Sequence, residues 1–301
     1  MPHALYSRSF RTLAVICRAF PLLLALTAIT ALLALGSKVY AQSGNAARKP
    51  STCLAIANRG SEPPVMNAAF VPAQARMPAV NIRYVTHSTF RIESPGGVIA
   101  ATDYAGRAGT GRLPDIVTMN HAHGTHYTNA PDQGIAHVLP GWGEFGEGID
   151  HWLEVDDLLV RNVSTDIYRG GVLIESNGNS IFVFEVAGLC IGHMGHLHHT
   201  LTPEHFAEIG RLDVLMLPVD GSVTMSVEGM SDLARQFRSS VILPMHWFSS
   251  FSLQRFLDQI GTAFEIRVAG GSDIDLSLDS LPQSPTVVVL NPEFGTSMGF
   301  D

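Results

Sequence analysis

The chain of 301 residues is poor in cysteine and in charge. Its three cysteines are too few for a small scaffold held together by many disulfides. Charged residues make up 15% of the chain, and 19 Lys and Arg against 27 Asp and Glu give a net charge of −8. This balance lacks the basic excess typical of nucleic-acid binding, so we expect no nucleic-acid partner.

The first 41 residues have the pattern of an export signal. Residues 1–18 contain three arginines and no acid, and an apolar run follows from Pro21 to Gly36. This order is typical of a secretory signal, and the residues that end at Ala41 predict cleavage there. An uncleaved membrane anchor is the alternative, because the apolar run nearly spans a bilayer. We therefore expect a periplasmic or secreted protein. The alternative is a protein anchored in the inner membrane and facing outward, and we expect contact with a membrane only in that case.

Beyond the signal, the composition predicts a linker and one domain. Residues 42–79 are rich in Ala, Pro, Ser and Asn, which is typical of a linker or arm, and a domain over 80–301 follows. Hydrophobic residues make up 46% of the chain, which excludes disorder. Cys53 and Cys190 could pair in an oxidising compartment, although we expect Cys190 to pack as a small buried apolar residue.

Apolar patterning predicts strands first and alternating strands and helices later. Strands are expected over 81–86, 88–93, 98–102, 115–120, 158–163, 171–175 and 181–185. Asn177-Gly178 predicts a hairpin turn between the last two. Further strands over 213–219, 241–245 and 286–290 alternate with helices over 203–209, 226–237 and 252–264. This order predicts an α/β domain of packed sheets with helices outside.

Histidines gather at three places, each directly after a predicted strand. The clusters are His121, His123 and His126; then His193, His196, His198 and His199; then His246. In α/β sheets, functional groups collect at the carboxyl ends of strands, so these segments can converge. Neutral imidazoles are ligands of transition metals, and a metal with an open position lowers the pKa of bound water toward ~7. The spacing therefore predicts a metal site, with His198 and His199 exposed or outside the ligand set.

The order of these segments resembles the metallo-β-lactamase-fold hydrolase superfamily, in particular its ascorbate-phosphate-lactonase-like and phospholipase-D-like branch. The resemblance covers about residues 82–290 and is carried by five segments: Thr86-His87-Ser88-Thr89-Phe90, Ala101-Thr102-Asp103, His121-Ala122-His123-Gly124-Thr125-His126, His193-Met194-Gly195-His196, and His246. It implies a four-layer αββα sandwich with a dinuclear metal site at one sheet edge. It also implies hydrolysis by metal-bound hydroxide.

Position by position, the resemblance implies a ligand set. His121, His123 and His193 would hold a first metal, while His126 and His246 would help to hold a second. The supporting residues implied are Asp103, which braces the metal loops, together with His87 and His199. Thr125 and His196 stand where the family carries a loop Asp and a bridging Asp, so they are the candidate catalytic positions. His196 could still ligate the second metal beside His126 and His246.

The function implied is an exported metal-dependent hydrolase that acts on an ester, lactone or phosphodiester of a small-molecule or lipid-like substrate. The expected cofactor is one or two zinc ions, with Fe, Mn or Ni as alternatives. Thr125 and His196 both replace an anionic side chain with a neutral one, which weakens the attraction for a dication. A non-catalytic metal-binding protein on the same fold is therefore the alternative function.

Overall fold

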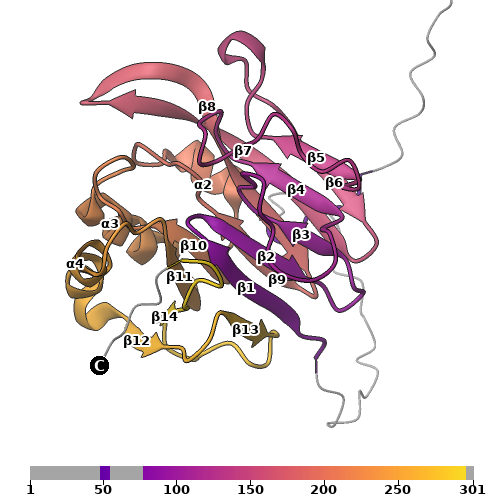
Figure 1. Cartoon of the computed structure of the whole chain (residues 1–301). Coiled ribbons are helices and arrows are strands. Elements are labelled where there is room, and N and C mark those ends of the chain that lie inside the picture. The colour runs from indigo at the N-terminus through magenta and orange to yellow at the C-terminus, as the bar shows by residue number, and fades with distance from the viewer. Residues whose placement is uncertain (1–47, 55–76, 296–301) are drawn as a thin grey trace, which may run out of the picture. The chain divides into compact units, whose positions relative to one another are not determined.

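The computed structural model describes residues 48–54 and 77–295 of the chain (Figure 1). The described residues from Pro50 onward belong to one compact unit. The predicted signal or anchor over 1–41 lies outside the described residues, as does most of the predicted linker. Within the described part, no helix has the length and apolarity needed to cross a bilayer.

A six-stranded sheet forms the first layer, in the order β13-β1-β2-β3-β4-β5. Its strands are β1 (Val80–Thr86), β2 (Thr89–Glu93), β3 (Ile99–Ala101), β4 (Ile116–Met119), β5 (His137–Pro140) and β13 (Asp273–Leu276). The pairs formed by β13, β1, β2 and β3 are antiparallel, whereas β3, β4 and β5 run parallel. The loops that leave β3 and β4 therefore emerge at the same edge of the sheet.

An eight-stranded sheet forms the second layer, in the order β12-β14-β11-β10-β9-β8-β7-β6. Its strands are β6 (Trp152–Val155), β7 (Leu158–Arg169), β8 (Val172–Val186), β9 (Leu189–His193), β10 (Val214–Pro218), β11 (Val241–Met245), β12 (Glu265–Val268) and β14 (Thr286–Val289). Strands β9, β10 and β11 are parallel neighbours. Their carboxyl ends meet at one edge, which brings the segments after residues 193, 218 and 245 together.

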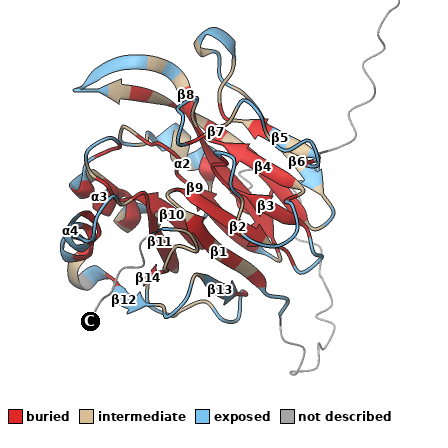
Figure 2. Ribbon diagram, in the orientation of Figure 1, coloured by how far each residue is buried: buried red, intermediate tan, exposed pale blue. Residues whose placement is uncertain are grey.

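The core lies between the two sheets, and the helices cover only one outer face. Ile82 and Phe90 of the first sheet pack against Phe182 and Ile191 of the second, and all four are fully buried. The helices α2 (Pro203–Ile209), α3 (Val227–Phe237) and α4 (Ser250–Ile260) bury their apolar faces on the other side of the eight-stranded sheet. Figure 2 shows the central strands of both sheets buried, with exposure in edge strands such as β12 and β13, the outer faces of the helices, the loops and the hairpin ends.

The fold class is confirmed, with one difference in its outer layers. In the described residues, the outer face of the six-stranded sheet is covered by loop side chains such as Tyr104 and Ile135 rather than by a helix. The chain between β3 and β4 holds three glycines with positive φ, at Gly106, Gly109 and Gly111. Such residues favour turns over helix, so this side is closed by loops. Two short 3-10 helices, η1 (Glu144–Gly146) and η2 (Gly261–Ala263), complete the elements.

The predicted hairpin turn at Asn177-Gly178 is wrong. Strand β8 runs through both residues, and the turn that joins it to β7 lies at Gly170-Gly171. Asn177 has a left-handed backbone (φ 52°), and the register with β7 shifts between Thr165 and Ile167. The Asn-Gly pair therefore produces a bulge rather than a turn, and the Asn177 amide donates to Asp166 (2.9 Å).

A disulfide joins Cys53 to Cys190, with their Cα atoms 5.9 Å apart. The expectation that Cys190 is only a buried apolar residue is thus corrected: it is buried and also cross-linked. Beside it, the Ser51 hydroxyl donates to Glu185 (2.5 Å) and the Thr52 amide to the same carboxylate (2.8 Å). Residues 51–53, within the segment predicted as a linker, are therefore fixed to the outer face of the eight-stranded sheet.

Candidate metal centre

A cavity of about 1100 Å³ opens where the loops from both sheets meet, and seven of the 13 histidines line it. They come from the turn after β1, the loop after β4, the loop after β9 and the residue after β11. These segments are distant in sequence but leave neighbouring strand ends. Members of all three predicted clusters line this cavity, whereas His126 and His193 do not.

Two imidazoles, His246 in the cavity wall and His126 buried behind it, are each fixed by a buried carboxylate. His126 lies in the loop after β4, and its Nδ1 donates to Asp103 Oδ2 (2.5 Å). His246 directly follows β11, and its Nδ1 donates to Asp220 Oδ1 (3.0 Å). All four side chains are at most 5% exposed. Because each Nδ1 carries the donated proton, each Nε2 presents a lone pair.

Both carboxylates are held in the ionised form. Burial opposes ionisation of Asp103, but the neighbouring His126 outweighs burial and places the pKa of Asp103 below its usual value. For Asp220, burial is likewise outweighed, here by hydrogen bonds from His246, Thr224 and Val223, so that its pKa is strongly lowered. Buried anions behind two imidazoles orient the rings and hold a proton on each Nδ1.

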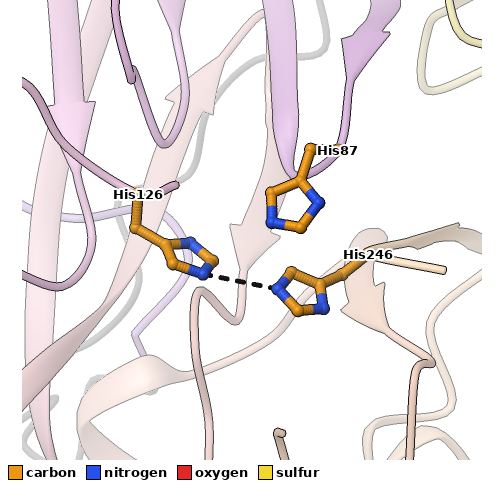
Figure 3. A group of neighbouring side chains, drawn as sticks. All are labelled: His87, His126 and His246. Carbon is orange, nitrogen blue, oxygen red and sulfur yellow. Dashed lines mark hydrogen bonds between the residues drawn. The ribbon is translucent and has the colours of Figure 1, made fainter. Parts of the chain in front are cut away.

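The distance between the facing nitrogens shows whether the two rings could bind one metal ion. His126 Nε2 and His246 Nε2 lie 3.3 Å apart and point toward one another (Figure 3). Without a proton or cation between them, two lone pairs would repel at this distance. Two nitrogens bound to one tetrahedral Zn²⁺ at about 2.0–2.1 Å are separated by about 3.3 to 3.4 Å. The observed spacing is that of an N–H···N hydrogen bond, as Figure 3 marks it, and equally that of two ligands of one ion, so the residues present fit a transition metal.

His87 completes a group of three. It lies in the β1–β2 turn with a left-handed backbone (φ 45°), and its ring centroid is 4.1 Å from that of His246. One nitrogen each from His87, His126 and His246 lie within 4.8 Å of one another (Figure 3). His87 Nε2 is buried and has no hydrogen-bond partner. Burial, together with His246 and His126, lowers the pKa of His87 to about 3, so its ring is neutral at pH 7.

His196 brings a fourth imidazole to the same place. Its ring centroid is 4.5 Å from that of His126 and 5.6 Å from that of His246. The side chain is buried and its Nδ1 has no hydrogen-bond partner. Burial and the surrounding imidazoles strongly lower its pKa. His196 is therefore a neutral base with an open acceptor atom beside the group of three.

The loop after β4 supplies a second, looser set of side chains. His121 is partly buried, and its Nδ1 donates to Gly178 O (2.6 Å). His123 and Thr125 are exposed and pair with each other, with Nδ1 and Oγ1 3.2 Å apart. The ring centroids of His121 and His123 lie 6.5 and 6.0 Å from that of His126. These residues border the cavity but lie outside the group of three.

The structure does not bring His193 or His199 into the centre. His193 Nε2 donates to Ser88 O (2.7 Å) and its Nδ1 accepts from the Gly195 amide (3.1 Å). His199 Nδ1 is 2.9 Å from Thr200 O, and its Nε2 accepts from the Asp166 amide (3.2 Å). Both nitrogens of each ring are thus engaged. His193 has no lone pair to offer a metal in this arrangement, and His87 stands in the group of three instead.

Two residues gain roles that sequence reasoning missed. His87 was expected only to support the site, and Asp220 was not singled out. A signal for Asp220 existed: it follows a buried strand that ends at an edge shared with other strands, where functional groups gather. The role of His87 depends on the backbone of a turn between antiparallel strands, which no local pattern indicates.

Comparisons with known proteins agree with this architecture. Residues 81–246 match the family described as the beta-lactamase superfamily domain. A UPF0173 metal-dependent hydrolase of Pyrococcus abyssi is 22% identical over 191 residues, covering 56% of this chain and 84% of the relative. The crystal structure of a Thermotoga maritima protein, assigned as a zinc-dependent hydrolase of the metallo-beta-lactamase superfamily, has a TM-score of 0.52 and 26% identity, covering 70% and 98% of the two chains.

Proposed function

The chain belongs to the beta-lactamase superfamily and is a metal-dependent hydrolase of it, and we propose that it hydrolyses an ester, lactone or phosphodiester with a transition metal held by His87, His126 and His246. The observation that carries the proposal is the pair of facing Nε2 atoms 3.3 Å apart, each backed by a buried carboxylate. Zinc is the preferred ion, because an all-nitrogen ligand set suits it well.

The residues of the chain would divide the work. When bound, a divalent metal activates water and polarises the oxygen of the bond to be cleaved. Asp103 and Asp220 keep His126 and His246 in the tautomer that presents Nε2. His196 Nδ1, buried and unpartnered, would accept a proton from the attacking water. His196 would then act as the general base in place of a carboxylate, since Thr125 is exposed and hydrogen-bonded to His123.

A second candidate function is metal binding without catalysis. It is favoured by Thr125 and His196, neutral residues at the two positions where the superfamily resemblance implies Asp. A buried base with a strongly lowered pKa is also a weak proton acceptor, because basicity falls with pKa. In this alternative the protein binds a metal at the same residues but does not catalyse hydrolysis.

We also propose export to the periplasm or the medium. The support is the Cys53–Cys190 disulfide, because such bonds persist chiefly in oxidising compartments. The basic and apolar pattern of residues 1–41 points in the same direction.

The experiment is metal analysis combined with a small substrate panel. The protein, expressed from the full chain under zinc-replete conditions, should retain about one equivalent of zinc after dialysis, since such sites bind strongly. It should hydrolyse at least one of p-nitrophenyl butyrate, γ-butyrolactone and bis-p-nitrophenyl phosphate, and chelation should abolish the rate. Bound zinc without turnover of any probe would favour the non-catalytic alternative, and a metal-free protein would overturn both.

A further inference from the structure

The mouth of the cavity is apolar, although its floor is made of imidazoles. Three of the residues that line it are large apolar side chains exposed to solvent: Ile174 (55% exposed), Val223 (46%) and Phe248 (61%). They come from β8, the loop after β10 and the segment after β11, so they are not one continuous stretch of sequence. We call these three residues the apolar rim.

The β7–β8 hairpin extends the rim away from the domain. Its end projects beyond the sheet and is largely exposed (Figures 1 and 2). Val172 is 63% exposed and lies two residues before Ile174 on the same strand, so both side chains share one face. An apolar surface thus leads from the hairpin end into the cavity. Exposed apolar side chains that gather at one opening indicate a binding function more than scattered ones do.

Size and charge narrow the class of ligand. A volume of about 1100 Å³ lies at the upper end of ligand pockets, which are typically about 300–1000 Å³, and exceeds what a small polar head group fills. Among the described residues that line the cavity, none is Asp or Glu, and Arg169 supplies the one permanent charge. No carboxylate of the described residues therefore faces a ligand in this cavity, because Asp103 and Asp220 lie behind the imidazoles.

We propose that the apolar rim binds the acyl chain of an amphiphilic substrate whose ester or phosphodiester group reaches the histidines. The inference rests on the proposed function, and it adds the class of substrate. In the simplest case, water adds across an acyl ester, the bond between the acyl carbon and the alcohol oxygen breaks, and a fatty acid and an alcohol leave. The chain lies on the rim because burial there removes apolar surface of both partners from water.

The test is a chain-length series. With p-nitrophenyl acetate, butyrate and octanoate below their critical micelle concentrations, kcat/KM of the zinc-loaded protein should rise about tenfold or more from acetate to octanoate, because each further methylene on the rim removes more apolar surface from water. Ile174→Ser and Phe248→Ser should remove most of this rise, so that the ratio of kcat/KM on octanoate to kcat/KM on acetate falls toward one. Ile266→Ser and Phe145→Ser are matched controls, since these exposed residues (47% and 101%) lie outside the cavity lining.

A binding measurement separates this inference from the proposed hydrolase activity. Metal-free protein should bind 11-(dansylamino)undecanoic acid, and Ile174→Ser should weaken that binding about tenfold relative to Ile266→Ser. Equal rates on all three esters, with binding indifferent to the rim, would overturn the inference and leave the hydrolase intact. Rim-dependent binding without turnover of any ester, of γ-butyrolactone or of bis-p-nitrophenyl phosphate would support the rim and overturn the proposed hydrolase activity. Rim-dependent binding to phosphatidylcholine vesicles without any chain-length preference would assign the rim to a lipid surface and overturn the inference.

Discussion

The histidines in and beside the cavity differ in how their side chains are held in place. His126 and His246 are buried, and each gives its Nδ1 proton to a buried carboxylate. His123 is exposed, and among the described residues its side chain hydrogen-bonds only to the Thr125 hydroxyl. An imidazole that is fixed and neutral loses little entropy when it binds a metal, whereas a mobile one must be ordered first. We call a ring supported when its Nδ1 donates to a buried carboxylate. Metal affinity should therefore depend on the supported rings rather than on the number of histidines nearby.

The largest effect should come from removing a supported ring. His246→Ala should abolish stoichiometric zinc retention and lower hydrolysis more than about 100-fold, because one of two facing ligands is lost. His123→Ala should change both by less than about threefold. Zinc content after dialysis and the rate on the best probe substrate measure the difference.

A folding control accompanies this pair. His246→Ala leaves Asp220 without one of its hydrogen bonds, although the Thr224 hydroxyl (2.5 Å) and the Val223 amide (2.7 Å) still donate to it. Circular dichroism and thermal melting of the metal-free variants establish that both fold. Equal loss of zinc in the two variants would show that support behind the ring does not govern affinity.

The next effect tests the carboxylates without touching a ligand. Asp103→Asn should weaken zinc binding about 10- to 100-fold, because the amide cannot accept the proton as an anion does and the ring loses its fixed tautomer. Asp115→Asn is the matched control: this partly exposed carboxylate pairs with Arg112 (2.7 Å), outside the centre. Competition with a chromophoric zinc chelator gives the two dissociation constants. An unchanged constant for Asp103→Asn would remove the distinction between supported and unsupported rings.

The sequence alone was enough for the fold class and the convergence of the loops. Strand patterning and the placing of histidines after strands predicted that His121, His123, His196 and His246 gather, and all four line one cavity. What failed depended on partners far along the chain. His193 is engaged by Ser88, 105 positions away, and the turn at Asn177-Gly178 became a bulge because β7 continues beside it. The spacing of histidines in the sequence indicates which side chains gather. Hydrogen bonds to distant residues decide which of their nitrogens keep a lone pair for a metal.

Acid should destabilise the metal-free protein through the buried rings. Burial lowers the pKa of His87, His193 and His196, so the folded state keeps them neutral while the unfolded state binds protons below about pH 6.5. The free energy of unfolding should therefore fall as pH drops from 6.5, with His87 alone contributing at most about 2 kcal/mol at pH 5. Depressed carboxylate pKa values, such as that of Asp103, act only below about pH 4.

Urea unfolding of chelator-treated protein at pH 7.5, 6.0 and 5.0 measures this loss. His87→Asn should flatten the dependence, because an amide does not titrate, while His123→Asn should leave it nearly as it is. A free energy of unfolding that stays level from pH 7.5 to 5.0 would show that the buried rings are not held neutral.

The smallest effect concerns the unsupported loop, and it separates a working site from a decayed one. Thr125→Asp restores the residue that the superfamily resemblance implies, and Thr125→Asn is its neutral control. Because position 125 is exposed, water screens the new charge, and zinc affinity should rise by less than about threefold. The rate should also change by less than about threefold if His196 already accepts the proton. A rate that rises more than tenfold in Thr125→Asp but not in Thr125→Asn would mean that the native site lacks a carboxylate base. The carboxylate-supported rings would then bind a metal at a site that no longer catalyses hydrolysis efficiently.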